Sequence, residues 1–285
     1  MSEGAELSLS ETRDSGWHRY RWRILAIGFA VVVSGLLTGG LMLGGSTRTP
    51  HAAAAVVRPP LAPPQPLDPV ALEVRRAIAA NAAVRQGSAK GRLVALTFDD
   101  GPGPYTAAVV TELRRLKAPA TFFEVGEMIP AYRTLVANMS RWGFVIADHT
   151  WSHPQLTGLP SAKVTNQLIW TQRLITKITG KPVQFMRPPY GALSPRVRTL
   201  AGRQGLVTTL WSIDTADWTR PGVGTIVARA LAARAGEIIL LHDGGGIRSQ
   251  TVAAIPTIVR RLRARGFHLV TLPQLLALAP PRFHR

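Results

Sequence analysis

The chain of 285 residues contains no cysteine. This absence excludes a disulfide scaffold, a cysteine-ligated zinc site, an iron–sulfur cluster and a thiol nucleophile. Any metal site must therefore use histidine, aspartate or glutamate. Acidic residues are also scarce, because 16 Asp and Glu stand against 34 Lys and Arg and leave a formal net charge of +18. Such an excess favours an acidic partner: nucleic acid, anionic lipid or an acidic polymer.

The distribution of the positive charge argues against nucleic acid. Arg outnumbers Lys by 29 to 5, a bias that GC-rich coding produces without any functional cause. A nucleic-acid-binding protein usually concentrates basic and aromatic residues on one element. Here the arginines are spread along the chain, and no such stripe is present. We therefore expect no nucleic-acid partner, and nothing in the sequence predicts an obligate protein partner.

Charged side chains are missing altogether from residues 24–45. A helix of 22 residues spans a hydrocarbon core of about 30 Å. The preceding residues 1–23 end in Arg19, Arg21 and Arg23, and the positive-inside rule keeps that end in the cytoplasm. We therefore expect a single-pass protein of the cell membrane, in which 24–45 is an uncleaved signal anchor and everything beyond it is extracytoplasmic.

A cleaved signal peptide is the alternative, and it would make the protein secreted. Small residues at Ala52–Ala55 offer a cleavage site, but the h-region of a signal peptide is usually about 7–15 residues long, shorter than this run. Six prolines between Ser46 and Asp68 predict an extended linker. The spacing of apolar residues from Pro69 to about Arg85 predicts a short helix. Residues 46–90 are therefore expected to be a Pro/Ala-rich linker with a short helix.

Residues 91–285 alternate between short apolar segments and amphipathic segments. The expected strands are 93–98, 120–125, 144–147, 184–186, 207–212, 237–241 and 268–270. The expected helices are 105–116, 131–141, 161–179, 195–203, 222–235 and 249–265. This alternation is typical of a parallel sheet with crossover helices. We expect an α/β fold, a distorted (β/α) barrel with about seven parallel strands, and an open doubly wound sheet is the alternative.

Polar residues whose side chains could take part in catalysis or bind a metal directly follow several of these strands. In α/β folds the carboxyl ends of the strands form the rim that carries the active site. Five expected strands deliver such groups to one rim, which solubility alone does not explain. The residues concerned are Asp99 and Asp100, His149 and His153, Arg187, Asp214 and Asp217, and His242 and Asp243.

His149 and His153 have the spacing of two metal ligands on one helical turn. Thr150 follows the first histidine, so the pattern is not the HExxH of zinc proteases. Asp99 or Asp100 can supply a third ligand. Because adjacent side chains of an extended segment point to opposite faces, one carboxylate could bind a metal while the other accepts a proton from water. An Asx turn at the Asp-Gly-Pro sequence is the structural alternative.

Six short motifs follow one another along the chain: TFDDGPGPYT (97–106), ATFFEVG (120–126), HTWSHP (149–154), RPPYG (187–191), DTADW (214–218) and LLHD (240–243). Taken together, these motifs resemble the polysaccharide deacetylases, carbohydrate esterase family four with its NodB-type homology domain. The resemblance covers roughly residues 92–278, and the motifs occur in the order of the family. One departure is Ala147-Asp148, where the family usually has Gly-Asn; Asp148 is expected either beside the metal site or exposed.

The resemblance implies a role for each matching residue. Asp99 would be the general base, and Arg187 would orient it. Asp100, His149 and His153 would bind a divalent metal, zinc in the first place, with cobalt, nickel or manganese as alternatives.

The remaining motifs imply the acid, the oxyanion donor and the pocket. His242 would be the general acid, and Asp214 would tune it. The backbone N–H of Tyr190 would stabilise the oxyanion. Trp218 and Leu240 would wall the small pocket that receives the acetyl methyl, and Pro189 would also contact the substrate.

The expected function is a metal-dependent N-deacetylase that acts on N-acetylglucosamine-containing polysaccharide, with peptidoglycan as the first substrate and chitin oligomers as the next. One alternative is an O-acetyl esterase that acts on a xylan-like glycan with the same residues. Another is a non-catalytic glycan-binding protein of the envelope. That second alternative predicts the loss of at least one of Asp99, Asp100, His149, His153 or His242, and all five are present.

Overall fold

The computed structural model describes residues 68–281. The expected cytoplasmic segment, the expected anchor at 24–45 and the proline-rich linker up to residue 67 lie outside the described residues. Between residues 68 and 281, none of the helices combines the length and the apolar character needed to cross a bilayer.

The first helix, α1 (Pro69–Ala79), belongs to the folded unit. Its N-cap is Asp68, whose carboxylate accepts a hydrogen bond from Val70 N, and proline at the first helical position is favourable. The helix ends before the expected boundary near residue 85. It packs against α5 (Pro195–Arg203) and α8 (Leu272–Leu278). Within the described residues, α1 is therefore part of the same packed unit as the helices of the catalytic domain.

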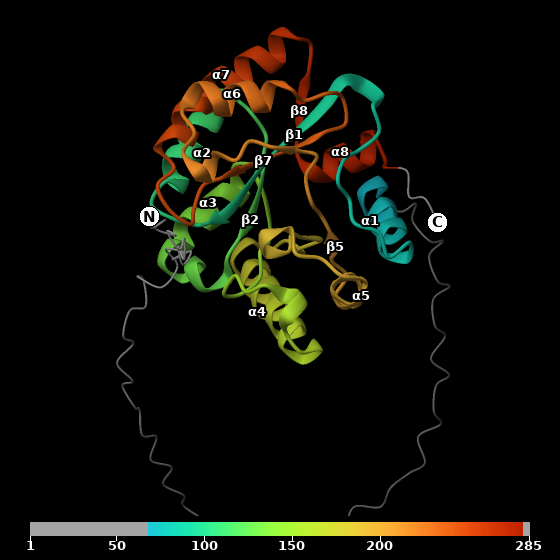
Figure 1. The fold of residues 1–285 in the computed structure, drawn as a ribbon. Coiled ribbons are helices and arrows are strands. Elements are labelled where there is room, and N and C mark those ends of the chain that lie inside the picture. Colours follow the sequence, from blue (N-terminus) through green and yellow to red (C-terminus); the bar gives the residue numbers. More distant parts are fainter. Residues whose placement is uncertain (1–67, 282–285) are drawn as a thin grey trace, which may run out of the picture. The chain divides into compact units, whose positions relative to one another are not determined.

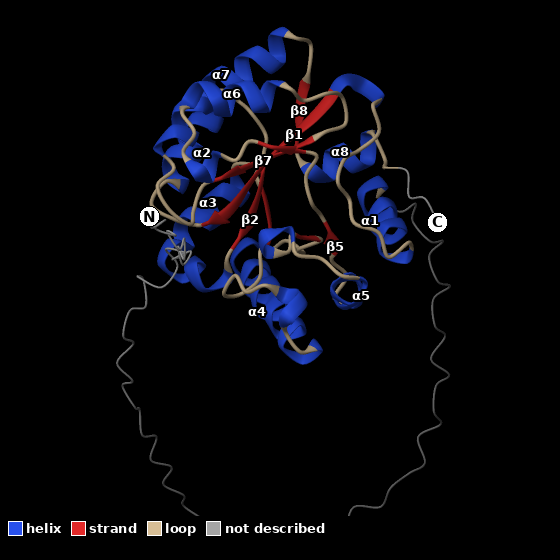
Figure 2. Cartoon of the chain, in the orientation of Figure 1, coloured by secondary structure: helices blue, strands red, loops and turns tan. Residues whose placement is uncertain are grey.

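One parallel sheet forms the centre of the described chain (Figures 1 and 2). Seven strands follow the order β5-β4-β3-β2-β1-β7-β6 and curl into a half-barrel, which confirms the expected parallel α/β fold. An eighth strand, β8, pairs with the first residues of β1, and β7 pairs with the rest of it. The strands are β1 (Leu93–Gly101), β2 (Thr121–Glu124), β3 (Val145–Asp148), β4 (Phe185–Met186), β5 (Val207–Thr208), β6 (Ile213–Asp214), β7 (Ile238–His242) and β8 (His268–Val270).

Helices cover the outer face of the sheet (Figure 1). Their apolar stripes pack on alternate residues of the strands and form the larger hydrophobic core. In the longest helix, Val164, Leu168, Thr171 and Ile175 are buried at helical spacing, and Gly180 ends the helix in a left-handed conformation. The outer helices are α2 (Thr106–Arg115), α3 (Arg133–Arg141), α4 (Ser161–Thr179), α6 (Val223–Leu231) and α7 (Ser249–Ala264), and α5 also contributes buried residues to this core.

The two faces of β1 show how the sheet positions the site. Val94, Leu96 and Phe98 belong to the outer core. Because side chains alternate along a strand, Thr97 and Asp99 lie on the inner face. The same alternation in β7 puts Leu240 and His242 on the inner face, since Ile239 and Leu241 belong to the outer core. Asp99 and His242 are register partners on neighbouring strands.

The segment 207–212, expected to be one strand, is divided in the structure. β5 pairs with β4 at one end of the sheet, and β6 pairs with β7 at the other. The residues between them cross from one edge to the other: Leu210 N donates to Val84 O, and Ser212 N donates to Ile238 O. A few extended residues can make this crossing because the sheet is curled and its two edges approach each other. Apolar character alone does not reveal such a crossing, since residues 207–210 are all buried although only the first two of them belong to β5.

Candidate metal centre and active site

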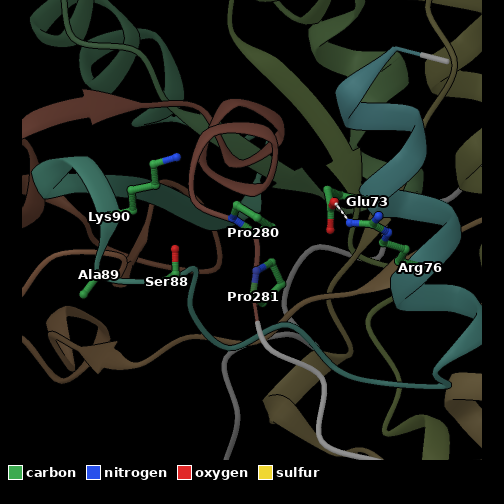
Figure 3. Close-up of a pocket in the computed structure, with 7 residues that line it drawn as sticks. All are labelled: Glu73, Arg76, Ser88, Ala89, Lys90, Pro280 and Pro281. Carbon is green, nitrogen blue, oxygen red and sulfur yellow. Dashed lines mark hydrogen bonds and ion pairs between the residues drawn. The ribbon is translucent and has the colours of Figure 1, made fainter. Parts of the chain in front are cut away.

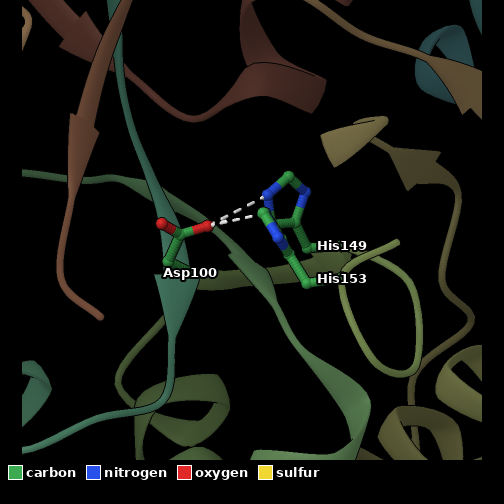
Figure 4. A group of neighbouring side chains, drawn as sticks. All are labelled: Asp100, His149 and His153. Atoms are coloured by element: carbon green, nitrogen blue, oxygen red, sulfur yellow. Dashed lines mark ion pairs between the residues drawn. The ribbon is translucent and has the colours of Figure 1, made fainter. Parts of the chain in front are cut away.

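Three side chains converge at the carboxyl ends of β1 and β3 (Figure 4). Oδ1 of Asp100 lies 3.3 Å from Nε2 of His149 and 3.1 Å from Nε2 of His153. The three potential ligand atoms all lie within 4.8 Å of one another. Between residues 68 and 281, this is the one group of three or more such side chains that could hold a metal ion.

The hydrogen bonds around His149 prepare it for a metal. Its Nδ1 lies 2.8 Å from the backbone oxygen of Arg187. Because a carbonyl can only accept, Nδ1 carries the proton and Nε2 presents its lone pair toward Asp100. Two imidazoles and one carboxylate suit zinc or another divalent transition metal. The residues present therefore fit the metal that the resemblance implies.

Several residues of this centre have a left-handed backbone. Asp100, Thr150 and His153 have φ values of 72°, 72° and 57°, and each such residue costs about 1–3 kcal/mol unless its surroundings enforce it. His149 and His153 thus lie on a loop, not on the helical turn that their spacing suggested. The register of β1 shifts between Asp99 and Gly101. This irregularity breaks the alternation expected for the two aspartates, and Oδ2 of Asp99 also approaches His149 Nε2, at 3.9 Å.

Asp99 is held by a buried arginine. Nη1 of Arg187 donates to Asp99 Oδ1 at 2.6 Å and to Thr97 Oγ1 at 2.9 Å, and Nη2 donates to Leu210 O at 2.9 Å. The Arg187 side chain is completely buried, and its guanidinium stacks 4.1 Å from the ring centroid of Phe123. The expected pair of Asp99 and Arg187 is therefore present in the structure.

The expected partner of His242 is wrong. His242 pairs with Asp217, not with Asp214: its Nδ1 lies 2.7 Å from Asp217 Oδ1, and its backbone N donates to Asp217 Oδ2 at 2.9 Å. Asp214 is exposed, and its carboxylate accepts a hydrogen bond from Ala216 N. The register explains this, because Asp214 lies opposite Leu240 on β7. The chain needs the left-handed turn at Ala216 (φ 47°) to bring Asp217 to His242.

The ion pair with Asp217 sets the protonation of His242. Burial alone would lower the pKa of this imidazole, but the hydrogen bond and charge of Asp217 outweigh it and raise the pKa to about 9. The same pair, together with a hydrogen bond from Thr251, holds the pKa of Asp217 below its usual value although burial opposes this. His242 therefore carries a proton at neutral pH, as a general acid must.

The expected substrate contacts lie around the rim with different exposure. Trp218 and Tyr190 are 55% and 63% exposed, whereas Pro189 and Leu240 are buried. The hydroxyl of Tyr190 lies 3.2 Å from Nδ1 of His153, and its backbone is left-handed with φ 61°. Leu240 lies two residues before His242 on the same face of β7, which suits a wall beside the acid.

Three buried carboxyl groups near the rim carry no role in the sequence interpretation. Asp148 is fully buried, so the exposed alternative is wrong, and its Oδ1 accepts a hydrogen bond from Thr150 N at 2.6 Å. Glu124 is its register partner on β2. Burial raises the pKa of both groups well above the usual value, and for Glu124 the charges of Asp243 and Asp99 add to the effect. Burial likewise raises the pKa of Asp243 to about 7.

Glu124 and Asp243 account for a glycine in the first motif. A Cβ on Gly101 would lie 2.4 Å from Asp243 Oδ2 and 2.7 Å from Glu124 Oε2. The motif therefore needs glycine here because two buried carboxyl groups occupy the space of any side chain. The sequence alone did not reveal this, because Glu124 ends β2 and Asp243 follows β7, and only the sheet brings both beside Gly101.

A hollow of about 710 Å³ lies elsewhere, beside α1 (Figure 3). It is lined by Glu73, Arg76, Ser88, Ala89, Lys90, Pro280 and Pro281. Arg76 forms an ion pair with Glu73 at 2.7 Å. None of the residues expected in the site lines this hollow, so the chemistry belongs to the rim.

Known proteins share this arrangement of sequence and fold. The profile of the family described as polysaccharide deacetylase matches residues 86–209. A peptidoglycan-N-acetylglucosamine deacetylase of Bacillus cereus is 39% identical over 189 residues, which are 65% of this chain and 88% of that protein. A chitooligosaccharide deacetylase of a Bradyrhizobium species is 38% identical over 198 residues, covering 65% of this chain and 90% of its relative.

A solved structure agrees with these relatives. The crystal structure of a peptidoglycan N-acetylglucosamine deacetylase in complex with a naphthalenyl N-oxidanyl-benzamide has a TM-score of 0.67 and 32% identity to this chain. It covers 70% of this chain, which in turn spans 95% of that structure. The chain therefore belongs to the polysaccharide deacetylase family.

Proposed function

We propose that the protein is a metal-dependent N-deacetylase of N-acetylglucosamine-containing polysaccharide, with peptidoglycan as its first substrate and chitin oligomers as the next. The observation that carries this proposal is the placement of Asp99 and His242 on adjacent strands, beside the cluster of Asp100, His149 and His153. Relatives named for both kinds of substrate support the substrate class.

Each residue of the chain then has a task in cleaving an amide. Asp100, His149 and His153 would hold a divalent metal, which would supply polarisation of the acetyl carbonyl and a lower pKa for water. Asp99, fixed by Arg187, accepts the proton as water attacks. The backbone N–H of Tyr190 donates to the developing oxyanion.

The leaving amine needs a proton, because an unprotonated amine departs poorly. His242 holds that proton at neutral pH through its contact with Asp217. Leu240 and Pro189 shape the space for the acetyl methyl, and the exposed ring of Trp218 offers a surface for a sugar ring.

We also propose that the catalytic unit acts outside the cytoplasmic membrane. The uncharged run at 24–45 behind three arginines supports this topology. The excess of positive charge suits an anionic wall polymer. Protease added to intact spheroplasts should degrade the catalytic unit, and its protection alongside a cytoplasmic marker would contradict this topology.

The test of the activity is acetate release from a panel of glycans. The full chain, stripped by a chelator and then given zinc or buffer, is incubated with peptidoglycan, chitin oligomers and acetylated xylan. We expect zinc-dependent acetate from the first two. Acetate from xylan alone would indicate O-deacetylation instead, and acetate from no substrate would contradict the proposed activity.

A further inference from the structure

The loop between the two histidine ligands is held residue by residue. Its first residue, Thr150, accepts a hydrogen bond from Gly126 N at 2.9 Å through its carbonyl. The carbonyl of Trp151 accepts one from Glu127 N, also at 2.9 Å. Both donors belong to the turn that follows β2. The last residue, Ser152, lies next to His153 and is held from another direction.

Ser152 forms two hydrogen bonds with the amide side chain of Gln167 on α4. Oε1 of Gln167 accepts a hydrogen bond from Ser152 N at 2.9 Å, and Nε2 of Gln167 donates to Ser152 Oγ at 2.9 Å. Since the backbone N–H of Ser152 can only donate, it fixes which way the amide faces. One side chain thus restrains both the backbone and the hydroxyl of the residue that precedes a metal ligand.

The same face of α4 continues this support. Trp170, one turn beyond Gln167, packs edge-to-face on Trp151 with ring centroids 6.1 Å apart. Thr171 closes the other side, because a Cβ on Gly126 would lie 2.6 Å from its Oγ1 and 2.6 Å from Trp151 Cε3. The loop is therefore clamped between α4 and the turn after β2.

His153 needs such restraint because its backbone is left-handed. Gln167 holds the peptide that joins Trp151 to Ser152, because Ser152 N donates to its Oε1, and it also holds the Ser152 hydroxyl. It thereby fixes the residue from which the chain enters the left-handed conformation at His153, whose own N–H donates to Thr150 Oγ1 at 3.1 Å. We propose that Gln167 is a positioning residue of the metal centre, which keeps His153 in the conformation that brings its imidazole to Asp100. This inference rests on the metal site of the proposed function.

The test compares metal affinity across variants of the full chain, measured as the Kd for zinc by competition with a chromophoric chelator. Gln167→Ala should raise the Kd for zinc about tenfold. Loss of a residue that supports a metal ligand usually weakens metal binding by about 10- to 100-fold, and the low end applies here because water can replace part of the contact to the exposed Ser152. Ser152→Ala should give a smaller loss, since it removes only the hydroxyl bond. Gln167→Glu should stay within about threefold of wild type, because its carboxylate accepts from both the N–H and the hydroxyl of Ser152.

Gln172 provides the matched control on the same helix. Its amide donates to Val183 O and Gln204 O, away from the loop. Gln172→Ala should lower the melting temperature of the metal-free protein as much as Gln167→Ala does, yet leave zinc affinity within about threefold of wild type. A Gln167→Ala protein with wild-type affinity, or an equal loss in Gln172→Ala, would overturn the positioning role.

Two further outcomes separate this inference from the function on which it rests. Wild type that binds no zinc would overturn the proposed metal site and the positioning role together. Wild type that binds zinc, with affinity unchanged by Gln167→Ala and Ser152→Ala, would overturn the positioning role alone. If Gln167→Ala does not fold, the contrast between Ser152→Ala and Gln172→Ala decides the question.

Discussion

His153 and His242 lie on the same rim, but their surroundings drive their protonation in opposite directions. Burial lowers the pKa of His153, which favours the neutral imidazole that a metal requires. His242 is also buried, yet Asp217 raises its pKa to about 9. Burial alone therefore does not decide the charge of a histidine in this site.

The difference lies in how each carboxylate is placed. One oxygen of Asp100 is divided between Nε2 atoms of two histidines, at 3.3 and 3.1 Å. One oxygen of Asp217 lies 2.7 Å from Nδ1 of His242, and its other oxygen accepts hydrogen bonds from the His242 backbone N and from the Thr251 hydroxyl. A carboxylate with donors on both of its oxygens, to which the Thr215 hydroxyl also contributes, stabilises one protonated imidazole. A carboxylate shared by two imidazole nitrogens instead suits a cation, and under the proposed function this contrast would let one rim hold a metal and an acid together.

Removing one ligand of the proposed metal centre should have the largest effect on activity. His149→Ala deletes one of three ligands, so zinc content should fall well below one ion per chain. Activity should drop at least about 10³-fold, since a metal contributes several kcal/mol to stabilising the transition state. Metal analysis and acetate release measure the two effects, and circular dichroism should still report a folded chain. Stoichiometric zinc in this variant would contradict the ligand assignment.

Removing the proposed general acid should lower activity less and leave zinc binding unchanged. His242→Ala should retain zinc at the wild-type affinity but lower kcat by roughly 10²–10⁴-fold, the usual contribution of a general acid. The comparison with His149→Ala sharpens the distinction, because only one of the two variants should lose zinc. Activity within about tenfold of wild type would make His242 a structural residue.

The partner of His242 is tested by a pair of matched substitutions. Asp217 raises the pKa of His242 to about 9. His242 therefore stays protonated up to about that pH and loses its proton as the pH rises further. Asp217→Asn removes the charge, and the pKa should fall toward ~6.5 or below. The alkaline limb of kcat/KM should therefore move to lower pH.

Asp214→Asn is the control, because Asp214 is exposed and its carboxylate accepts a hydrogen bond from Ala216 N rather than from His242. It should leave the alkaline limb in place. A shift in Asp214→Asn without one in Asp217→Asn would reverse the assignment. Melting temperatures of both variants show whether the loss of a buried carboxylate has also loosened the fold.

The smallest effect is expected outside both histidine environments. Trp218→Ala removes an exposed ring that we place against a sugar, and aromatic contacts of this kind contribute about 0.5–1.5 kcal/mol. KM for a soluble chitin oligomer should rise up to about tenfold while kcat changes little, as expected for uniform binding. Unchanged KM would remove Trp218 from the substrate contacts, and a large fall in kcat would place it closer to the chemistry than its exposure suggests.

Local sequence patterns were sufficient to predict much of the fold and of the proposed metal centre. The alternation of apolar strands and amphipathic helices predicted the parallel α/β fold, and α4 and α5 have the expected bounds. Asp100, His149 and His153 were predicted from residue types and spacing together with the family resemblance, and the structure brings them together. These features depend on the chemistry of each segment or on motifs shared with relatives, so they are readable before the chain folds.

Only the tertiary structure decided between Asp214 and Asp217. Both lie close together in the chain, Asp214 as the last residue of β6 and Asp217 three residues later, so nothing in their own segment distinguishes them. The choice depends on the register of β6 against β7 and on the left-handed turn at Ala216. The separation of β5 from β6 has the same origin, because it follows from the closure of a curled sheet.

The sequence by itself determined which side chains this protein has available for a metal, a base and an acid, because residue type and motif order are written in it. The tertiary structure decided which carboxylate charges His242, which backbone positions are left-handed, and that Gln167 reaches Ser152. Each of these depends on contacts between segments that only register, helix packing and loop geometry bring together. Their energies arise between elements, and no single stretch of sequence contains them.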